Sequence, residues 1–190
     1  MKLLTTCILT FWTMILWSQG SEVLSTIHYS DQKSGMIVLG TWGISNAIIG
    51  SVGSLRSTHL EVKSFHQMNL GWGIINAGIA SLGYYSALKG GTIPLESMSL
   101  LQENQSLKSI LLLNTGLDVA YMISGVYLIE KDKNSIKNPG RLRGFGKSLI
   151  MQGAFLFVFD LGMYINFNSQ TKDIIKLFSQ NGAIGLSYTF

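Results

Sequence analysis

Cysteine and charge are both scarce in this chain of 190 residues, and each shortage excludes a class of protein. The one cysteine, Cys7, lies in the N-terminal apolar segment, so a mature chain without that segment has no thiol. Disulfide bridges, thiolate catalysis and iron–sulfur ligation are then excluded. Charged residues make up 13% of the chain, whereas soluble domains have roughly 25%. The 21 glycines do not indicate disorder, because they lie inside apolar runs, and membrane helices tolerate glycine.

A small excess of positive charge does not indicate a nucleic-acid-binding protein. The formal net charge is +4, and the basic residues concentrate in Glu130–Lys147. No aromatic stacking platform accompanies them, so no nucleic acid partner is expected. A cytoplasmic loop explains the cluster, and we interpret its bases as anchors for the anionic inner leaflet of a membrane.

The first 20 residues have the pattern of a secretory signal peptide. A lysine at position 2 precedes an apolar stretch from Leu3 to Trp17, and small residues follow at positions 18 and 20. We expect cleavage after Gly20, with an uncleaved N-terminal anchor as the alternative. Residues 21–34 then form an outer N-terminal segment.

Four further segments have the length of membrane spans. Each runs for about 20 residues, which is what a helix needs to cross the hydrocarbon core. Their apolarity is continuous rather than alternating, which disfavours lipid-facing strands, and none has the charged outer face of a soluble helix. The sequence therefore predicts an all-α fold, a membrane four-helix bundle occupying residues 35–167, with spans at 35–55, 67–88, 107–129 and 145–167.

The loops between these spans predict the orientation of the bundle. Eight lysines and arginines lie in the first and third loops, Arg56–His66 and Glu130–Lys147, against five in the segments on the other side. Because basic loops stay on the cytoplasmic side, both termini are expected outside. The tail, residues 168–190, ends in an alternating stretch that we interpret as an exposed edge or a docked segment, since one strand alone cannot span a membrane.

A motif occurs twice in the first two spans. WGISNAIIG begins at Trp42 and WGIINAGIA at Trp72, and small residues recur at helical spacing in both. Such stripes let two helix backbones approach closely, so the spans should form a helical hairpin. Asn46 and Asn76 lie at the edge of the stripes, and we expect their amides to bond across the hairpin. A ligand-facing asparagine is the alternative.

The last two spans carry polar residues that are costly in a bilayer. Asn114, Asp118 and Tyr121 share one helical face, and Gln152 and Asp160 lie near one face of the fourth span. An aspartate at bilayer depth costs at least about 2.5–3.5 kcal/mol, so both must point inward. They either mark a proton or ion pathway or fix the helix register, and the sequence leaves both readings open.

His66 and Asn69 begin the second span and share a face with Asn76. A histidine at a helix start could titrate or ligate a metal or haem. It is the one histidine at membrane depth, since His28 and His59 fall in predicted loops, and one ligand is too few for such a site. We therefore predict no metal and no cofactor, and a capping or interfacial role is the simpler reading.

The four blocks TWGISN, FHQMNLGWGIIN, LNTGLDVAYMISG and RLRGFGKSLIMQGAFLFVFD resemble a family of uncharacterised small bacterial membrane proteins with four spans. The resemblance covers residues 35–167 and implies an integral protein of the bacterial envelope. We expect the inner membrane as its location. It implies no activity. The chain departs from the family's pattern at Gly73, where a further asparagine is expected.

These observations favour binding or scaffolding over catalysis. The expected function is that of an integral membrane protein whose polar core binds a small ligand or a proton, or holds a partner. Its expected partners are the lipid bilayer and either a second copy or another membrane protein. The alternatives are a proton-, ion- or solute-conducting oligomer and a membrane redox or enzyme subunit that uses His66 with Asp118. The candidate site residues are Asp118, Asp160, Asn46, Asn76, Asn114, Tyr121, His66 and Asn69.

Overall fold

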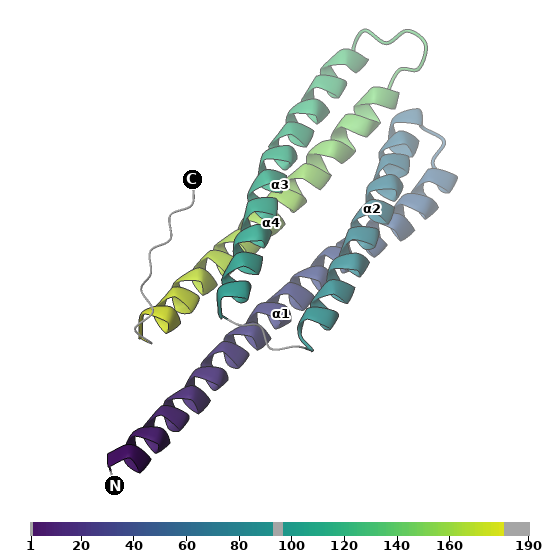
Figure 1. Cartoon of the computed structure of the whole chain (residues 1–190). Coiled ribbons are helices and arrows are strands. Elements are labelled where there is room, and N and C mark those ends of the chain that lie inside the picture. The colour runs from purple at the N-terminus through teal and green to yellow at the C-terminus, as the bar shows by residue number, and fades with distance from the viewer. Residues whose placement is uncertain (1, 93–96, 181–190) are drawn as a thin grey trace.

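Four long helices make up the described part of the chain (Figure 1). The computed structural model describes residues 2–92 and 97–180, and the side chains of 22–92 and 98–176. Within the described residues there is no strand. The helices are α1 (Lys2–Arg56), α2 (Leu60–Gly90), α3 (Ser97–Asp132) and α4 (Arg141–Gln180). The predicted all-α four-helix bundle is confirmed.

The bundle consists of two helical hairpins. α1 packs along α2, and α3 packs along α4, in the two most extensive helix pairs of the molecule. α4 also packs against α2 and, over a shorter stretch, against α1, so it joins the hairpins. In contrast, the backbones of α2 and α3 do not contact each other in the described part of the chain. Contact between these two helices is therefore made by side chains, such as the rings of Trp72 and Tyr121.

Three of the helices are long and apolar enough to cross a membrane. They are the segments Glu22–Arg56, Met98–Asp132 and Arg141–Lys176. α2 is not among them, because asparagine, glycine, serine and tyrosine interrupt its apolar run. Large apolar side chains cover the outside of the bundle, among them Leu82, which is 73% exposed, and Val158, which is 71% exposed. An outer face of this kind is typical of contact with lipid or with another protein.

The helices extend well beyond the predicted spans. α1 continues through residues 21–34 and into the predicted signal segment, and α4 continues to Gln180, so most of the predicted tail is helical. Residues 181–190, which carry the alternating stretch, lie outside the described residues. The expectation that His28 lies in a loop is wrong, since it lies within α1. Cleavage after Gly20 stays a prediction.

Glycines bring α1 and α2 into close backbone contact, as the small-residue stripes predict. A Cβ atom added to Gly43 would lie 2.6 Å from the backbone nitrogen of Ala77, and one added to Gly50 would lie 2.6 Å from that of Leu70. Gly73 faces the backbone of α1 in the same way. An asparagine at position 73 would therefore collide with the neighbouring helix.

The second hairpin uses the same device. A Cβ atom on Gly125 would lie 2.6 Å from the carbonyl oxygen of Gly146, and one on Gly153 would lie 2.8 Å from that of Asp118. The close approach at Gly153 brings the Asp118 turn of α3 directly onto α4. Small residues thus set the helix spacing, while the apolar core of the bundle is a modest cluster around Leu39, Ala80 and Leu156.

Candidate functional site

A cavity of about 110 Å³ lies between the two hairpins, on the side where α2 and α3 face each other. Its apolar lining includes Trp72 and Ile79 from α2 and Phe159 from α4. Five of the eight candidate residues supply its polar lining, and no lysine or arginine lines it. These five are Asn76, Asn114, Asp118, Tyr121 and Asp160.

Helical spacing explains why these side chains meet. Asn114, Asp118 and Tyr121 lie at i, i+4 and i+7 of α3, on one face of the helix, as the sequence predicts. The glycine contact at Gly153 holds this face against α4, which contributes Asp160 from two turns further along. The cavity therefore collects polar groups from α2, α3 and α4, although α2 and α3 do not touch at the backbone.

The carboxyl groups of Asp118 and Asp160 lie within hydrogen-bonding reach of each other. Both residues are buried, with exposed fractions of 2% and 6%. A carboxylate has no hydrogen to donate, so a hydrogen bond within the pair requires one proton held between the two groups. Asp118 Oδ2 and Asn76 Nδ2 are buried with no other hydrogen-bond partner in the described part of the chain. The site thus has an unpartnered amide donor, Asn76 Nδ2, beside the carboxyl pair.

A second polar cluster, the amide network, fills the bundle nearer the α1–α2 and α3–α4 turns. Gln152 is fully buried at its centre. Its amide nitrogen donates to Asn46 Oδ1 at 2.9 Å and to Asn69 Oδ1 at 3.1 Å. Its amide oxygen accepts from Trp42 Nε1 at 2.8 Å, and Ser148 donates to Asn69 at 2.5 Å. Because these groups satisfy one another, the network is suited to holding helices together rather than to binding a ligand.

The expected bond between Asn46 and Asn76 is wrong. The Asn46 amide donates to the backbone oxygen of Trp42 at 2.8 Å and accepts from Gln152 of α4. Asn46 lies three positions after Gly43, but its side chain points toward α4. The side chain of Asn76 lines the cavity instead. Asn76 and Asp118 share the cavity with Asn114 and Asp160, whereas Asn46 belongs to the amide network.

His66 lies apart from the cavity. Its ring packs over Gly53 of α1 and against the neighbouring Phe65. Ten residues of α2 separate it from Asn76, which is roughly 15 Å along the helix axis. The structure therefore does not bring His66 and Asp118 into one site. Within the described residues, no group of three or more histidine, aspartate, glutamate or cysteine side chains comes together.

The end of the bundle away from the α1–α2 and α3–α4 turns contains a buried polar layer that the sequence analysis missed. His28 of α1 is fully buried, and its Nδ1 donates to Gln170 Oε1 of α4 at 3.0 Å. The Gln170 amide in turn donates to Asp31 at 2.8 Å. From α3, Lys108 donates to Thr171 at 3.1 Å. The signal for this layer was polar residues four apart, such as His28 and Gln32, in segments beyond the apolar runs.

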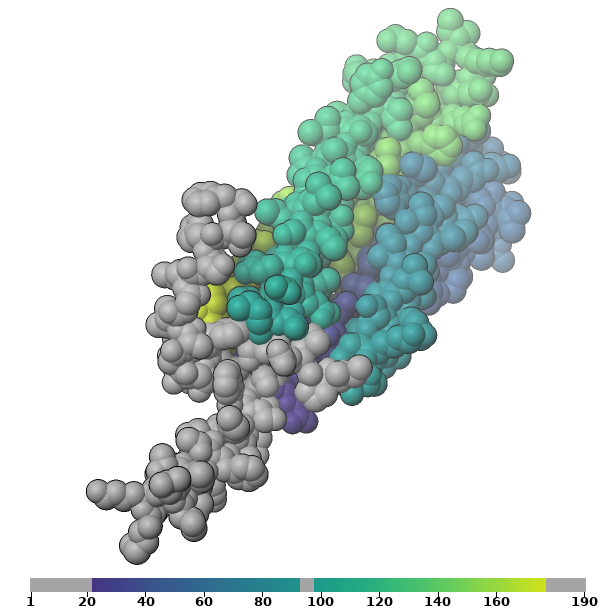
Figure 2. Space-filling view, viewed as in Figure 1, coloured from purple at the N-terminus to yellow at the C-terminus, as the bar shows by residue number. Residues whose placement is uncertain are grey.

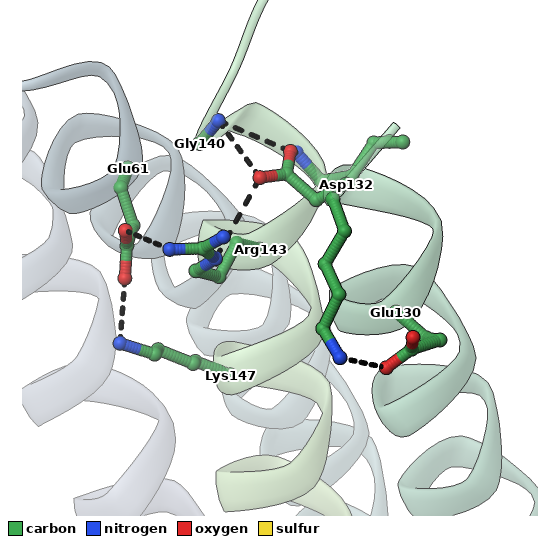
Figure 3. A network of polar contacts seen from close by, with 8 residues as sticks. Glu61, Glu130, Asp132, Gly140, Arg143 and Lys147 are labelled. Atoms are coloured by element: carbon green, nitrogen blue, oxygen red, sulfur yellow. Dashed lines mark hydrogen bonds and ion pairs between the residues drawn. The ribbon is translucent and has the colours of Figure 1, made fainter. Parts of the chain in front are cut away.

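An ionic cluster closes the opposite end of the bundle (Figure 3). The Asp132 carboxylate accepts hydrogen bonds from the backbone of Gly140 at 2.9 Å and of Leu142 at 3.1 Å, which caps the start of α4. Gly140 has a φ of +90°, which favours glycine. Arg143 lies 3.6 Å from Asp132, and Lys147 lies 2.5 Å from Glu61 of α2. Three of the bases interpreted as lipid anchors, Lys133, Arg143 and Lys147, thus bind carboxylates of the protein itself.

Comparison with curated proteins and with solved structures finds no match. A family model does match, and its description is that of a family of unknown function. The match covers residues 38–161, which include all of α2 and α3, the adjoining parts of α1 and α4, the cavity and the amide network. It agrees closely with the extent of the resemblance that the four sequence blocks indicate. The chain belongs to this family of unknown function, DUF6992.

Proposed function

We propose that this chain is an integral membrane protein with four spans that binds a small hydrogen-bonding group in the cavity around Asp118 and Asp160. Three helices with the length and composition of membrane spans support the location. α2 has no lysine, arginine, aspartate or glutamate between Lys63 and Lys89, and it packs along α1. We propose that it crosses the membrane with its partner.

The proposal includes a bacterial inner membrane location with both termini outside. The ionic cluster and the basic residues around it lie at the α1–α2 and α3–α4 turns. The positive-inside rule puts this end of the bundle in the cytoplasm. The outer polar layer around His28 then lies at the other membrane surface, where a polar layer costs less than at the midplane.

One observation carries the binding proposal: two buried carboxyl groups face each other in a cavity without a basic residue. Acidic side chains at bilayer depth are rare and mark functional sites. In the amide network of the same bundle, hydrogen-bond donors are matched to acceptors, which is typical of a structural role. By contrast, the cavity has volume to spare and buried polar atoms without partners.

Native mass spectrometry of the detergent-purified protein tests the proposal. We expect the wild-type protein to carry a small bound molecule and an Asp118→Asn, Asp160→Asn double variant to lose it. Glu130→Gln is the matched control, because it makes the same chemical change at an exposed carboxyl group in the ionic end of α3. The proposal is contradicted if the double variant still carries the bound molecule. It is also contradicted if the wild-type protein carries no bound molecule, whichever membrane extract it is purified from.

Proton binding is the second candidate, and the carboxyl pair itself favours it, since a hydrogen bond between the two groups requires a shared proton. A complete pathway through one bundle would also have to pass the amide network. A conducting form would therefore require an oligomer, and the mass of the native particle reports its stoichiometry in the same experiment.

A further inference from the structure

The cavity opens sideways, toward the surface that faces lipid in the proposed function. Ile79 of α2 and Leu117 of α3 line the cavity, yet they are 53% and 43% exposed on the outside of the bundle. They flank its mouth from the two helices whose backbones do not contact each other. In Figure 2, α2 and α3 lie on either side of a strip in which α4 and α1 are visible.

An aromatic pair bounds the cavity on the side of the amide network. The rings of Trp72 and Tyr121 meet edge to face, with centroids 4.9 Å apart, and bridge α2 and α3 at this level. Leu156 and Phe159 of α4 form the back wall with Leu39 of α1. The cavity is therefore a lateral notch whose back and one end are closed by side chains.

The chemistry of the notch selects the group that can enter it. Two carboxyl groups and the absence of any lysine or arginine disfavour phosphate and carboxylate groups. A hydroxyl group both donates and accepts, so it can donate to a carboxyl oxygen of Asp118 and accept from the unpartnered amide of Asn76. The volume of about 110 Å³ holds several water-sized groups but not a long acyl chain.

We infer that the notch binds the hydroxyl head of a neutral, long-chain amphiphile that enters from the bilayer between α2 and α3. The apolar chain stays outside, against Ile79 and Leu117, while the head lies between Asn76 and the carboxyl pair. This inference rests on the proposed function, because it requires both a membrane-embedded bundle and a ligand in this cavity.

Photolabelling of the full-length protein in phosphatidylcholine vesicles tests the inference. The probe is a long-chain alcohol with a diazirine next to its hydroxyl group, and the control probe is its methyl ether, which cannot donate. We expect the alcohol to label peptides containing residues 72–79 and 117–121, about threefold to tenfold more than the ether, as expected for one hydrogen bond. Excess unlabelled alcohol should compete, which makes the test independent of any variant.

Two tryptophan substitutions test the route. Ile79→Trp places a larger side chain in the mouth and should abolish labelling of the notch by the long-chain alcohol. Ile75→Trp is the matched control, since Ile75 is also 53% exposed on α2 but does not line the cavity. Equal labelling of the two variants overturns lateral entry.

A short, water-soluble diazirine alcohol separates this inference from the proposed function. If the short probe labels the notch and the long probe does not, the amphiphile is excluded, while a small ligand in the cavity stands. If the ether labels as well as the alcohol, or neither alcohol labels, the hydroxyl head is excluded. The native mass spectrum then decides the proposed function independently.

Discussion

Gln152 makes three hydrogen bonds to side chains of α1 and α2 from the first half of α4. It therefore ties three helices together through one side chain. Removing it leaves the half-buried Trp42 indole and the buried Asn46 side chain without this partner, which costs more than the net value of the bonds themselves.

We expect Gln152→Leu to lower the free energy of unfolding by about 1–3 kcal/mol, the cost of leaving a buried polar group unpaired. Thermal unfolding in detergent measures the change. Gln67→Leu, at an exposed position on α2, is the control and should have little effect. A Gln152→Leu variant as stable as wild type would mean that water replaces the amide.

We expect substitution of the carboxyl pair to change the free energy of unfolding less than Gln152→Leu does. Two asparagines at positions 118 and 160 can form an amide–amide hydrogen bond without a shared proton, so we expect the double variant to unfold within about 1 kcal/mol of wild type. The same thermal unfolding assay applies. A variant that fails to fold would show instead that the acids fix the helix register, and the binding proposal would lose its support.

At the scale of helices, glycine contacts explain why the hairpin was predictable. Close backbone approach requires small residues at steps of three and four, so the geometry of α1 against α2 is visible in the sequence at Gly43, Gly50 and Gly73. The hydrogen-bond partner of Asn46 could not be predicted from such spacing. An asparagine at the edge of a stripe can turn toward either neighbouring helix, and the docking of α4 decided it.

The sequence did not predict the helix ends or the polar layer around His28, for a related reason. Apolar runs locate the hydrocarbon span, but a helix can continue past it with polar residues that are buried by neighbouring helices. His28 and Gln170 meet only because α1 and α4 both extend in this way. The cavity residues were predictable because they lie inside the spans, where polar side chains stand out.

A substitution of Gly43 by alanine tests the hairpin contact. Its Cβ would lie 2.6 Å from the Ala77 backbone nitrogen, so the helices must separate, and we expect a loss of about 1–3 kcal/mol in the free energy of unfolding. Gly78→Ala is the control. No atom lies within 4 Å of that position, and its higher helix propensity should leave stability equal or raised. Similar losses in both variants would contradict the close packing of α1 and α2.

At the scale of the whole molecule, the scarcity of cysteine makes the topology directly measurable. In a chain whose Cys7 is replaced by serine, single cysteines at Thr92 and Ser135 report the α2–α3 and α3–α4 connections. We expect a membrane-impermeant maleimide to label position 92 in intact cells and position 135 only after the membrane is opened. Labelling of both positions in intact cells would contradict the four-span arrangement.

The missing contact between α2 and α3 also has a mechanical consequence. Each hairpin is closed along its length by glycines, and the ionic cluster joins the hairpins at one end through Glu61 and Lys147. Contacts of α4 with α2 and α1 therefore carry most of the attachment between the two hairpins. Between α2 and α3 the spacing is left to side chains such as Trp72 and Tyr121, so substitutions of these rings would change the width of that gap without altering a helix.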